Sequence, residues 1–249
     1  MTIDANALFG MWSIRTQGID DPDEFVRHMD GYDIDKSIIV TLAAMSFDTI
    51  IGNGDTIEAC QAHPDRLMGL CVVNPKTDLT DPFEQMERCR DAGLVGLRLT
   101  PQHRYSYSDV ELLRPVIERA AEYDWPVWVS LVVVQNTPFG SQPVTAVGPL
   151  LDAYPDVPFI VTGIGYGGRL EAMEVLPDRP NAFMDIGTMQ CAFAVDRLCE
   201  DLGAEKIVLG TGFAINHYGI TMSKLETADI SDEQETMIRS GNITRILQM

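Results

Sequence analysis

Three charged or titratable side chains occupy positions from which they could carry acid–base chemistry. Arg98 and Thr100 lie two residues apart in an apolar run, so both side chains should point to the same face of a strand. Asp185 ends a second apolar run, and His217 follows a third. Histidine titrates near neutrality, and a desolvated aspartate can act as a general base. We therefore predict His217, Asp185 and Arg98 as catalytic residues.

Each of these side chains also has a structural interpretation. A buried arginine needs a counter-charge, which for Arg98 could be Asp185 in a structural ion pair or a substrate carboxylate. Asp185 could instead accept hydrogen bonds from loop amides. A serine–histidine–aspartate triad would use Ser130 with His217 and Asp185, but the sequence contains no nucleophile-elbow motif to support it.

The substrate pocket is predicted from uncharged polar and aromatic side chains near the same segment ends. The six residues assigned to it are Asn6, Trp12, Thr100, Trp128, Ser130 and Tyr166. Such a lining suits an uncharged or weakly polar small organic molecule. Each aromatic side chain could equally serve core or loop packing.

A cluster of glycines follows the sixth apolar run. Gly163, Gly165, Gly167 and Gly168 could cradle an anion at the start of a helix. Isolated glycine motifs are weak signals, so the favoured interpretation is a tight strand-to-helix turn.

The elements that must position these residues alternate along the chain. Short apolar runs predict eight strands: 3–8, 37–42, 67–73, 94–99, 126–132, 158–164, 181–186 and 206–210. Amphipathic segments predict helices over 22–29, 82–91, 109–123, 145–154, 170–176, 194–202 and 233–247. Alternating strands and helices over about 250 residues predict an α/β fold with a single (β/α)8 barrel domain spanning 1–249. An open doubly wound sheet is the alternative, but no GxGxxG motif follows the first run.

The barrel assignment also places the longer loops. Parallel strands of such a barrel all point to one face, where the strand-to-helix loops form the active site. The longest of these predicted loops are 9–21, 133–144 and 211–232.

Composition narrows the classes of partner. The net charge is −19 and only 18 of 249 residues are basic, which disfavours nucleic acid and anionic membranes as partners. Such an acidic surface is typical of a halophilic source or of a GC-rich genome. Five cysteines without a CxxC pair, and no signal-like or membrane-spanning segment, predict a cytoplasmic protein with reduced thiols.

Six short motifs, in order along the chain, resemble the amidohydrolase-related (amidohydrolase-2) family. They lie at 3–8 (I-D-x-H-x-H in the family), 24–30, 63–69 (H-P-D-R-[LF]-x-G), 96–101 (G-[LI]-K-L-H-P), 181–185 and 242–247. The resemblance implies a barrel that acts on small molecules. It also implies a divalent metal held by two histidines on the first strand, further histidines on the fifth and sixth, and an aspartate on the eighth.

At these positions the chain departs from the family. The residues that stand where the resemblance places metal ligands are Asn6, Leu8, Ser130, Gly163 and Gly212, and Thr100 replaces the fourth-strand histidine. Zinc needs three or four imidazole, thiolate or carboxylate ligands, which these residues do not supply. The four histidines of the chain are too scattered along the sequence to rebuild such a site. We therefore expect no metal and no other cofactor.

Three functions stay open at this point. The first is a metal-independent enzyme for lactone hydrolysis, decarboxylation, dehydration, isomerisation or cyclisation of a small molecule. The second is a catalytically inactive relative that binds a small molecule. The third is a non-catalytic subunit paired with an active amidohydrolase. Fold alone does not separate them. We expect a homo-oligomer that binds a small-molecule substrate, with pairing to an active amidohydrolase as the alternative.

Overall fold

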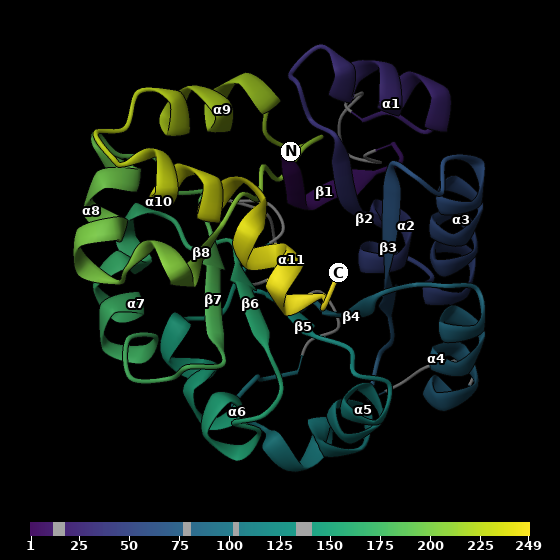
Figure 1. Cartoon of the computed structure of the whole chain (residues 1–249). Coiled ribbons are helices and arrows are strands. Elements are labelled where there is room, and N and C mark those ends of the chain that lie inside the picture. The colour runs from purple at the N-terminus through teal and green to yellow at the C-terminus, as the bar shows by residue number, and fades with distance from the viewer. Residues whose placement is uncertain (12–17, 77–80, 102–104, 133–140) are drawn as a thin grey trace.

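Eight parallel strands form one sheet in which each strand pairs with the next one in the sequence (Figure 1). The computed structural model describes all residues except 12–17, 77–80, 102–104 and 133–140. The strands are β1 (Ile3–Phe9), β2 (Lys36–Thr41), β3 (Leu67–Val72), β4 (Gly96–Leu99), β5 (Val127–Ser130), β6 (Phe159–Thr162), β7 (Ala182–Asp185) and β8 (Ile207–Val208). All eight predicted strands are confirmed, with shorter bounds from β3 onward.

Backbone hydrogen bonds bring the first and last strands together and nearly close the barrel. The amide of Ala5 donates to the carbonyl of Leu209 (2.6 Å), and the amide of Gly212 donates to the carbonyl of Asn6 (2.7 Å). The (β/α)8 barrel expected from the alternation of elements is therefore confirmed.

Helices surround the strands (Figure 1). They are α1 (Pro22–Asp30), α2 (Leu42–Ser46), α3 (Thr49–Ala62), α4 (Pro82–Asp91), α5 (Val110–Glu122), α6 (Gly148–Ala153), α7 (Arg169–Val175), α8 (Ala194–Asp201), α9 (Tyr218–Glu226), α10 (Asp232–Thr236) and α11 (Asn242–Ile246). A π-helical turn, Met237–Gly241, joins the last two into one helical run, which matches the helix predicted over 233–247.

Three of these helices, α2, α3 and α9, were not predicted, and α9 corrects the expectation of a loop over 211–232. The sequence of α3 contains two glycines and an asparagine, which are poor helix formers. The tertiary structure uses them: a side chain at Gly52 would lie 2.0 Å from the backbone of Ala44. The buried Asn53 side chain both donates to and accepts from the backbone of Val72. Packing of this kind overrides local propensity.

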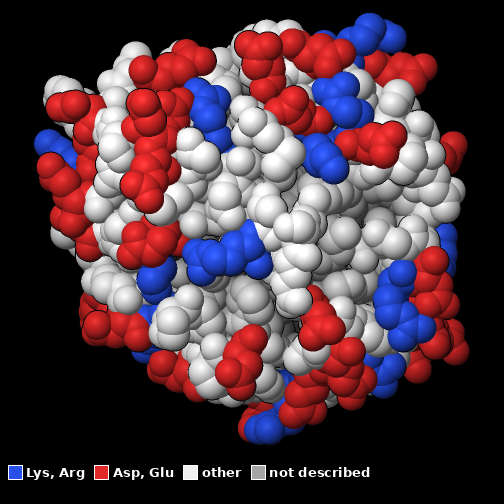
Figure 2. Space-filling view, viewed as in Figure 1, with Lys and Arg blue, Asp and Glu red and all other residues white. Residues whose placement is uncertain are grey.

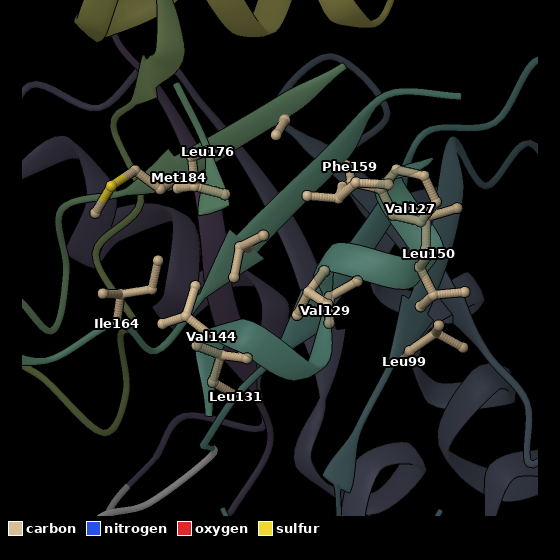
Figure 3. Packing of buried hydrophobic residues seen from close by; sticks show 14 of the residues in the cluster. Leu99, Val127, Val129, Leu131, Val144, Leu150, Phe159, Ile164, Leu176 and Met184 are labelled. Carbon is tan, nitrogen blue, oxygen red and sulfur yellow. The ribbon is translucent and has the colours of Figure 1, made fainter. Parts of the chain in front are cut away.

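The outer faces of the strands form the main hydrophobic core with the helices. Val129 and Met184 point outward from β5 and β7, and Leu150 of α6 lies on this outer side of the barrel (Figure 3). These side chains are fully excluded from solvent. Alternation along each strand therefore sends the neighbouring residues, including Ser130 and Asp185, into the barrel.

The outer surface is strongly acidic. Acidic side chains outnumber basic ones on the face in Figure 2 and gather mainly around its edge. In the part of the chain that the structure describes, no helix is long and apolar enough to cross a membrane.

Candidate active site

The barrel interior contains an apolar layer with a polar layer above it. Trp128, Ile160 and Phe183 belong to the apolar layer. Two residues further along β5 and β6, toward the carboxyl ends, Ser130 and Thr162 enter the polar layer, because side chains two apart on a strand share a face. The polar layer therefore lies at the end of the barrel where strand-to-helix loops build active sites.

The Arg98 guanidinium is the centre of the polar layer. Its Nε donates to Ser130 Oγ (2.7 Å), one Nη donates to Asn6 Oδ1 (2.9 Å) and the other to Thr162 Oγ1 (3.1 Å). These contacts join β4 to β1, β5 and β6. Arg98 is only 3% exposed. Burying a charge is costly, so these hydrogen bonds must compensate for the water that the guanidinium has lost.

Asn6 connects Arg98 to Asp185. Its amide Nδ2 donates to Asp185 Oδ2 (2.6 Å), while its Oδ1 accepts from Arg98. The pairing of β1 with β2 shifts by one residue between Asp4 and Ala7. Such an irregularity re-aims side chains within a strand, and here Asn6 faces both charged groups. The counter-charge predicted for Arg98 is thus Asp185, reached through an amide rather than by direct contact.

A second buried carboxylate lies beside this network. Asp4 accepts hydrogen bonds from the backbone amides of Asn6 (3.0 Å) and Thr211 (2.9 Å) and from Thr211 Oγ1 (2.5 Å). It therefore ties β1 to the segment that follows β8. Both of its oxygens are occupied, which indicates a structural role for Asp4.

Burial shifts the titration of all three charged groups. Loss of water raises the pKa of Asp185 to about 6, against the opposing effects of the hydrogen bond from Asn6 and the charge of Arg98. Burial also raises the pKa of Asp4 to about 6 and lowers that of Arg98 to about 10. Asp185 can consequently change protonation state close to neutral pH, as a general acid or base requires.

One oxygen of Asp185 is left over. Within the described residues, its buried Oδ1 has no hydrogen-bond partner. Buried polar atoms are nearly always hydrogen-bonded, and a functional role is one explanation for an atom that is not.

Gly210 makes the close approach of Asp185 and Asn6 possible. A Cβ at position 210 would lie 2.6 Å from the Cβ of Asp185 and 2.9 Å from that of Asn6. We expect Gly210→Ala to lower the free energy of unfolding by roughly 1–3 kcal/mol, the usual cost of overpacking, as measured by urea denaturation. Gly167→Ala is the matched control, because a Cβ there meets no atom within 4 Å. Equal stability of both variants would contradict tight packing at Gly210.

A cavity of about 380 Å³ begins directly after two members of the network. Leu131 and Val132 follow Ser130, and Gly163 and Ile164 follow Thr162; all four line it. Its wall continues through the glycines at 165, 167 and 168. The turn Tyr166–Gly168 leads directly into α7, so the tight-turn interpretation of these glycines is confirmed. The carboxylate of Glu171, also in the wall, accepts a hydrogen bond from the backbone amide of Val144 (2.9 Å).

A second cavity, of about 360 Å³, lies between α1, α3 and the ends of β1 and β2. Asp20, Asp55 and Glu58 contribute to its lining, and burial together with Glu58 raises the pKa of Asp55. None of the residues that hold Arg98 lines either cavity, but the wall of the first cavity begins at the residues directly after Ser130 and Thr162. The first cavity is therefore the better candidate for a substrate pocket.

The structure separates His217 from the other two predicted catalytic residues. Its exposed ring caps the start of α9, accepting the Gly219 amide at Nδ1 (3.2 Å). Its Nε2 lies 3.1 Å from the Tyr32 hydroxyl. The ring of His28, on α1, lies 6.1 Å away, centre to centre. The structure thus brings Arg98 and Asp185 together but does not assemble Ser130, His217 and Asp185 into a triad.

The predicted pocket residues also divide. Asn6 and Ser130 hold Arg98, whereas Trp128 lies one layer below, where its Nε1 donates to the carbonyl of Ala5 (2.8 Å). Thr100 is fully buried, and its amide donates to the Tyr105 hydroxyl (3.3 Å). Tyr166 is 63% exposed and is not part of the wall of the first cavity. Trp12 lies outside the described residues.

Several site residues were missed. The resemblance placed the sixth-strand ligand position at Gly163, but Thr162 is the residue that contacts Arg98. The inward direction of the Thr162 side chain could have been found by pairing β6 with β5, because Thr162 lies beside Ser130 and Ile160 beside Trp128. Asp4 carried a weaker signal, as an acidic residue within an apolar run. Nothing local indicated Gly210.

The donors in the barrel do not suit the metal that the resemblance implies. Asn6 and Ser130, at two of the ligand positions, both accept hydrogen bonds from Arg98. A divalent ion would have to share this space with a fixed cation. Among the described residues there is no group of three or more histidine, cysteine, aspartate or glutamate side chains that could hold a metal ion.

Comparison with protein families gives a clear match. A family model described as amidohydrolase covers residues 47–249, most of the chain. The chain belongs to this amidohydrolase family. The family expected from the six motifs is thereby shown, although the motifs at 3–8 and 24–30 precede the matched region. No curated protein sequence matched the chain.

Solved structures of this amidohydrolase's fold are numerous and distant in sequence. The 5-carboxyvanillate decarboxylase of Sphingomonas paucimobilis has a TM-score of 0.78 at 15% identity, covering 100% of this chain and 99% of that one. A 2,6-dihydroxybenzoate decarboxylase has a TM-score of 0.74 at 14% identity, with 100% and 98% covered. The 4-oxalomesaconate hydratase of Rhodopseudomonas palustris has a TM-score of 0.72 at 16% identity, with 100% and 96% covered. At such identities the similarity establishes the fold.

Proposed function

We propose that this amidohydrolase is a metal-independent enzyme that transfers a proton to or from a small organic substrate. The observation that carries the proposal is the buried arrangement of Arg98, Asn6 and Asp185, in which a fixed cation occupies the centre of the polar layer. In this role Asp185 exchanges the proton, and Arg98 stabilises negative charge that develops on the substrate.

The chemistry of the similar structures supports this class of reaction. Decarboxylation and hydration both include a proton transfer, and these are the activities named for the similar enzymes. Lactone hydrolysis, dehydration, isomerisation and cyclisation would use the same two groups. The cavity beyond Ser130 and Thr162 has a largely apolar wall of Leu131, Val144 and Ile164, which suits a small carbon skeleton.

A second candidate is a catalytically inactive protein that binds a small molecule. The observation that favours it is burial: Arg98 is 3% exposed, Asp185 1%, and Asn6, the most exposed of the three, 7%. A substrate would have to reach groups that are almost completely shielded from solvent.

Metal analysis tests the first half of the proposal. We expect the purified protein, equilibrated with Mn²⁺ or Zn²⁺ and desalted, to retain far less than one ion per chain. Its melting temperature should be unchanged by a chelator, since no metal would contribute to folding. One tightly held ion per chain, with lower stability after chelation, would overturn metal independence.

Turnover assays test the second half. The assays use 5-carboxyvanillate, 2,6-dihydroxybenzoate and 4-oxalomesaconate as first substrates, always with chelator present. If one is turned over, we expect Asp185→Asn to lower kcat by at least about 100-fold, the usual contribution of a general acid or base. An Asp185→Asn variant of full activity would refute the role of Asp185. Binding of a compound without turnover would favour the second candidate.

A further inference from the structure

The ammonium group of Lys224 makes an unusual set of contacts beside the candidate active site. Lys224 lies on α9, and its Nζ donates to the backbone carbonyls of Ile186 (2.5 Å), Gly187 (3.0 Å) and Met189 (3.2 Å). An ammonium has three hydrogens to donate, so all three are used. The three acceptors belong to the turn that begins directly after Asp185.

The turn that Lys224 holds is also fixed on its other sides. A Cβ at Gly187 would lie 2.6 Å from the carbonyl oxygen of Gly210, so the turn packs closely against the segment after β8. On the opposite side, the hydroxyl of Thr188 donates to the carbonyl of Ile164 (3.0 Å). Ile164 is part of the cavity wall. The turn therefore connects α9, Asp185 and the candidate substrate pocket.

Lys224 also contributes charge. Asp185 is surrounded by Asn6 and Asp4 from β1, Arg98 from β4 and Lys224 from α9. The two cations favour its ionised form, whereas burial and the charge of Asp4 oppose it. Neither cation forms an ion pair with Asp185 among the salt bridges of the described residues, so each acts on it across intervening atoms. In a buried setting such interactions are poorly screened.

Lys224 itself is affected by the same environment. Burial lowers its pKa to about 8, while the charge of Asp185 acts in the opposite direction. Burying an ammonium is costly, so the contacts of Lys224 must offset that cost. Lysine is also rare in this chain, with only four in 249 residues.

We propose that Lys224 is a positioning residue for this site: it fixes the turn after β7 and holds a positive charge beside the carbonyl of Ile186, the residue next to Asp185. The inference rests on the proposed function for the importance of Asp185, but its geometry does not depend on the reaction. Lysine suits this position because a compact ammonium can donate to three converging carbonyls, and an arginine there would keep the positive charge.

The experiment follows the titration of Asp185 by NMR of ¹³C-labelled carboxyl groups, assigned with Asp185→Asn. Lys224→Gln keeps two donors for the turn but removes the charge. We expect the Asp185 midpoint to rise by roughly one pH unit in Lys224→Gln and to stay close to the wild-type value in Lys224→Arg. Lys206→Gln is the matched control. The Lys206 ammonium also donates to two backbone carbonyls, of Leu176 and Arg179, but at the opposite end of the barrel.

The outcomes separate charge from structure. An unchanged midpoint in Lys224→Gln overturns the proposal, as does an equal rise in Lys224→Gln and Lys206→Gln or in Lys224→Gln and Lys224→Arg. Should Lys224→Gln not fold, the wild-type protein provides the second test: the Asp185 carbon signal should respond to a further titration near pH 8, where Lys224 loses its proton. Absence of that response also overturns it.

Failure of the enzyme proposal would look different. The titration is read without any substrate, so a shifted Asp185 midpoint in a protein that turns over none of the compounds supports the role of Lys224 and argues against catalysis. In an active enzyme, the pH profile of kcat should move by the same amount as the Asp185 midpoint, while a purely structural defect would lower activity at every pH.

Discussion

Replacing Arg98 with methionine is expected to lower the free energy of unfolding by about 3–5 kcal/mol, the size of loss expected when several buried polar groups lose a charged hydrogen-bond donor. The guanidinium supplies hydrogen bonds to Ser130, Asn6 and Thr162. Without it, three buried polar groups lose a donor and Asp185 loses one of its two neighbouring cations. Urea denaturation at pH 7 measures the change.

A double variant shows how much of this loss of stability comes from leaving the Asp185 carboxylate without Arg98. Asp185→Asn together with Arg98→Met removes both charges at once, so neither is left without the other, and the double variant should be more stable than the two single changes added together would predict. The exposed pair Arg114–Glu111 provides the control. We expect Arg114→Met to cost far less than Arg98→Met, because surface ion pairs contribute little to stability. A similar cost at both arginines would refute the central role of Arg98.

The second large effect concerns pH. Asp4 and Asp185 have a pKa of about 6 in the folded protein, above the ordinary value of 3.8. The folded state therefore holds these protons more tightly than the unfolded state. The stabilisation is complete below about pH 4 and is lost as pH rises through about 6. Two pKa units correspond to roughly 3 kcal/mol per group.

This effect is measured as a difference between variants, which cancels the other carboxyl groups. Asn at position 4 keeps an oxygen for the amides of Asn6 and Thr211 but cannot ionise. We expect the stability of Asp4→Asn relative to the wild type to improve steadily between pH 4 and pH 7 in urea denaturation. Glu111→Gln should change in the opposite direction, because the hydrogen bond from Arg114 lowers the pKa of Glu111. A constant difference between Asp4→Asn and the wild type would contradict the raised pKa of Asp4.

The strands were predictable because their signal is local. Each strand is an apolar run with residues of alternating direction, and neighbouring strands of a barrel follow one another in sequence. Helices α3 and α9 were not, because their stability comes from contacts such as Gly52 against Ala44 and Lys224 with the turn after β7. Such contacts join segments that the sequence does not relate.

The candidate site was half predictable for the same reason. Arg98, Asn6, Ser130 and Asp185 could be recognised from residue type and strand phase, and the structure joins all four through Arg98 and Asn6. His217 could not be placed, because its position depends on where α9 starts and on how that helix packs against α1.

The sequence by itself determined the barrel, the acidic surface and the family, because strand alternation, charge and short motifs are all properties of neighbouring residues. Only the tertiary structure decided which polar groups meet. The register shift in β1 turns Asn6 toward Arg98 and Asp185, and Gly210 leaves room for that approach. Lys224 reaches the turn beside Asp185 only after the chain has folded around the barrel to α9. Distances between such groups depend on closure of the whole sheet, which no local pattern records.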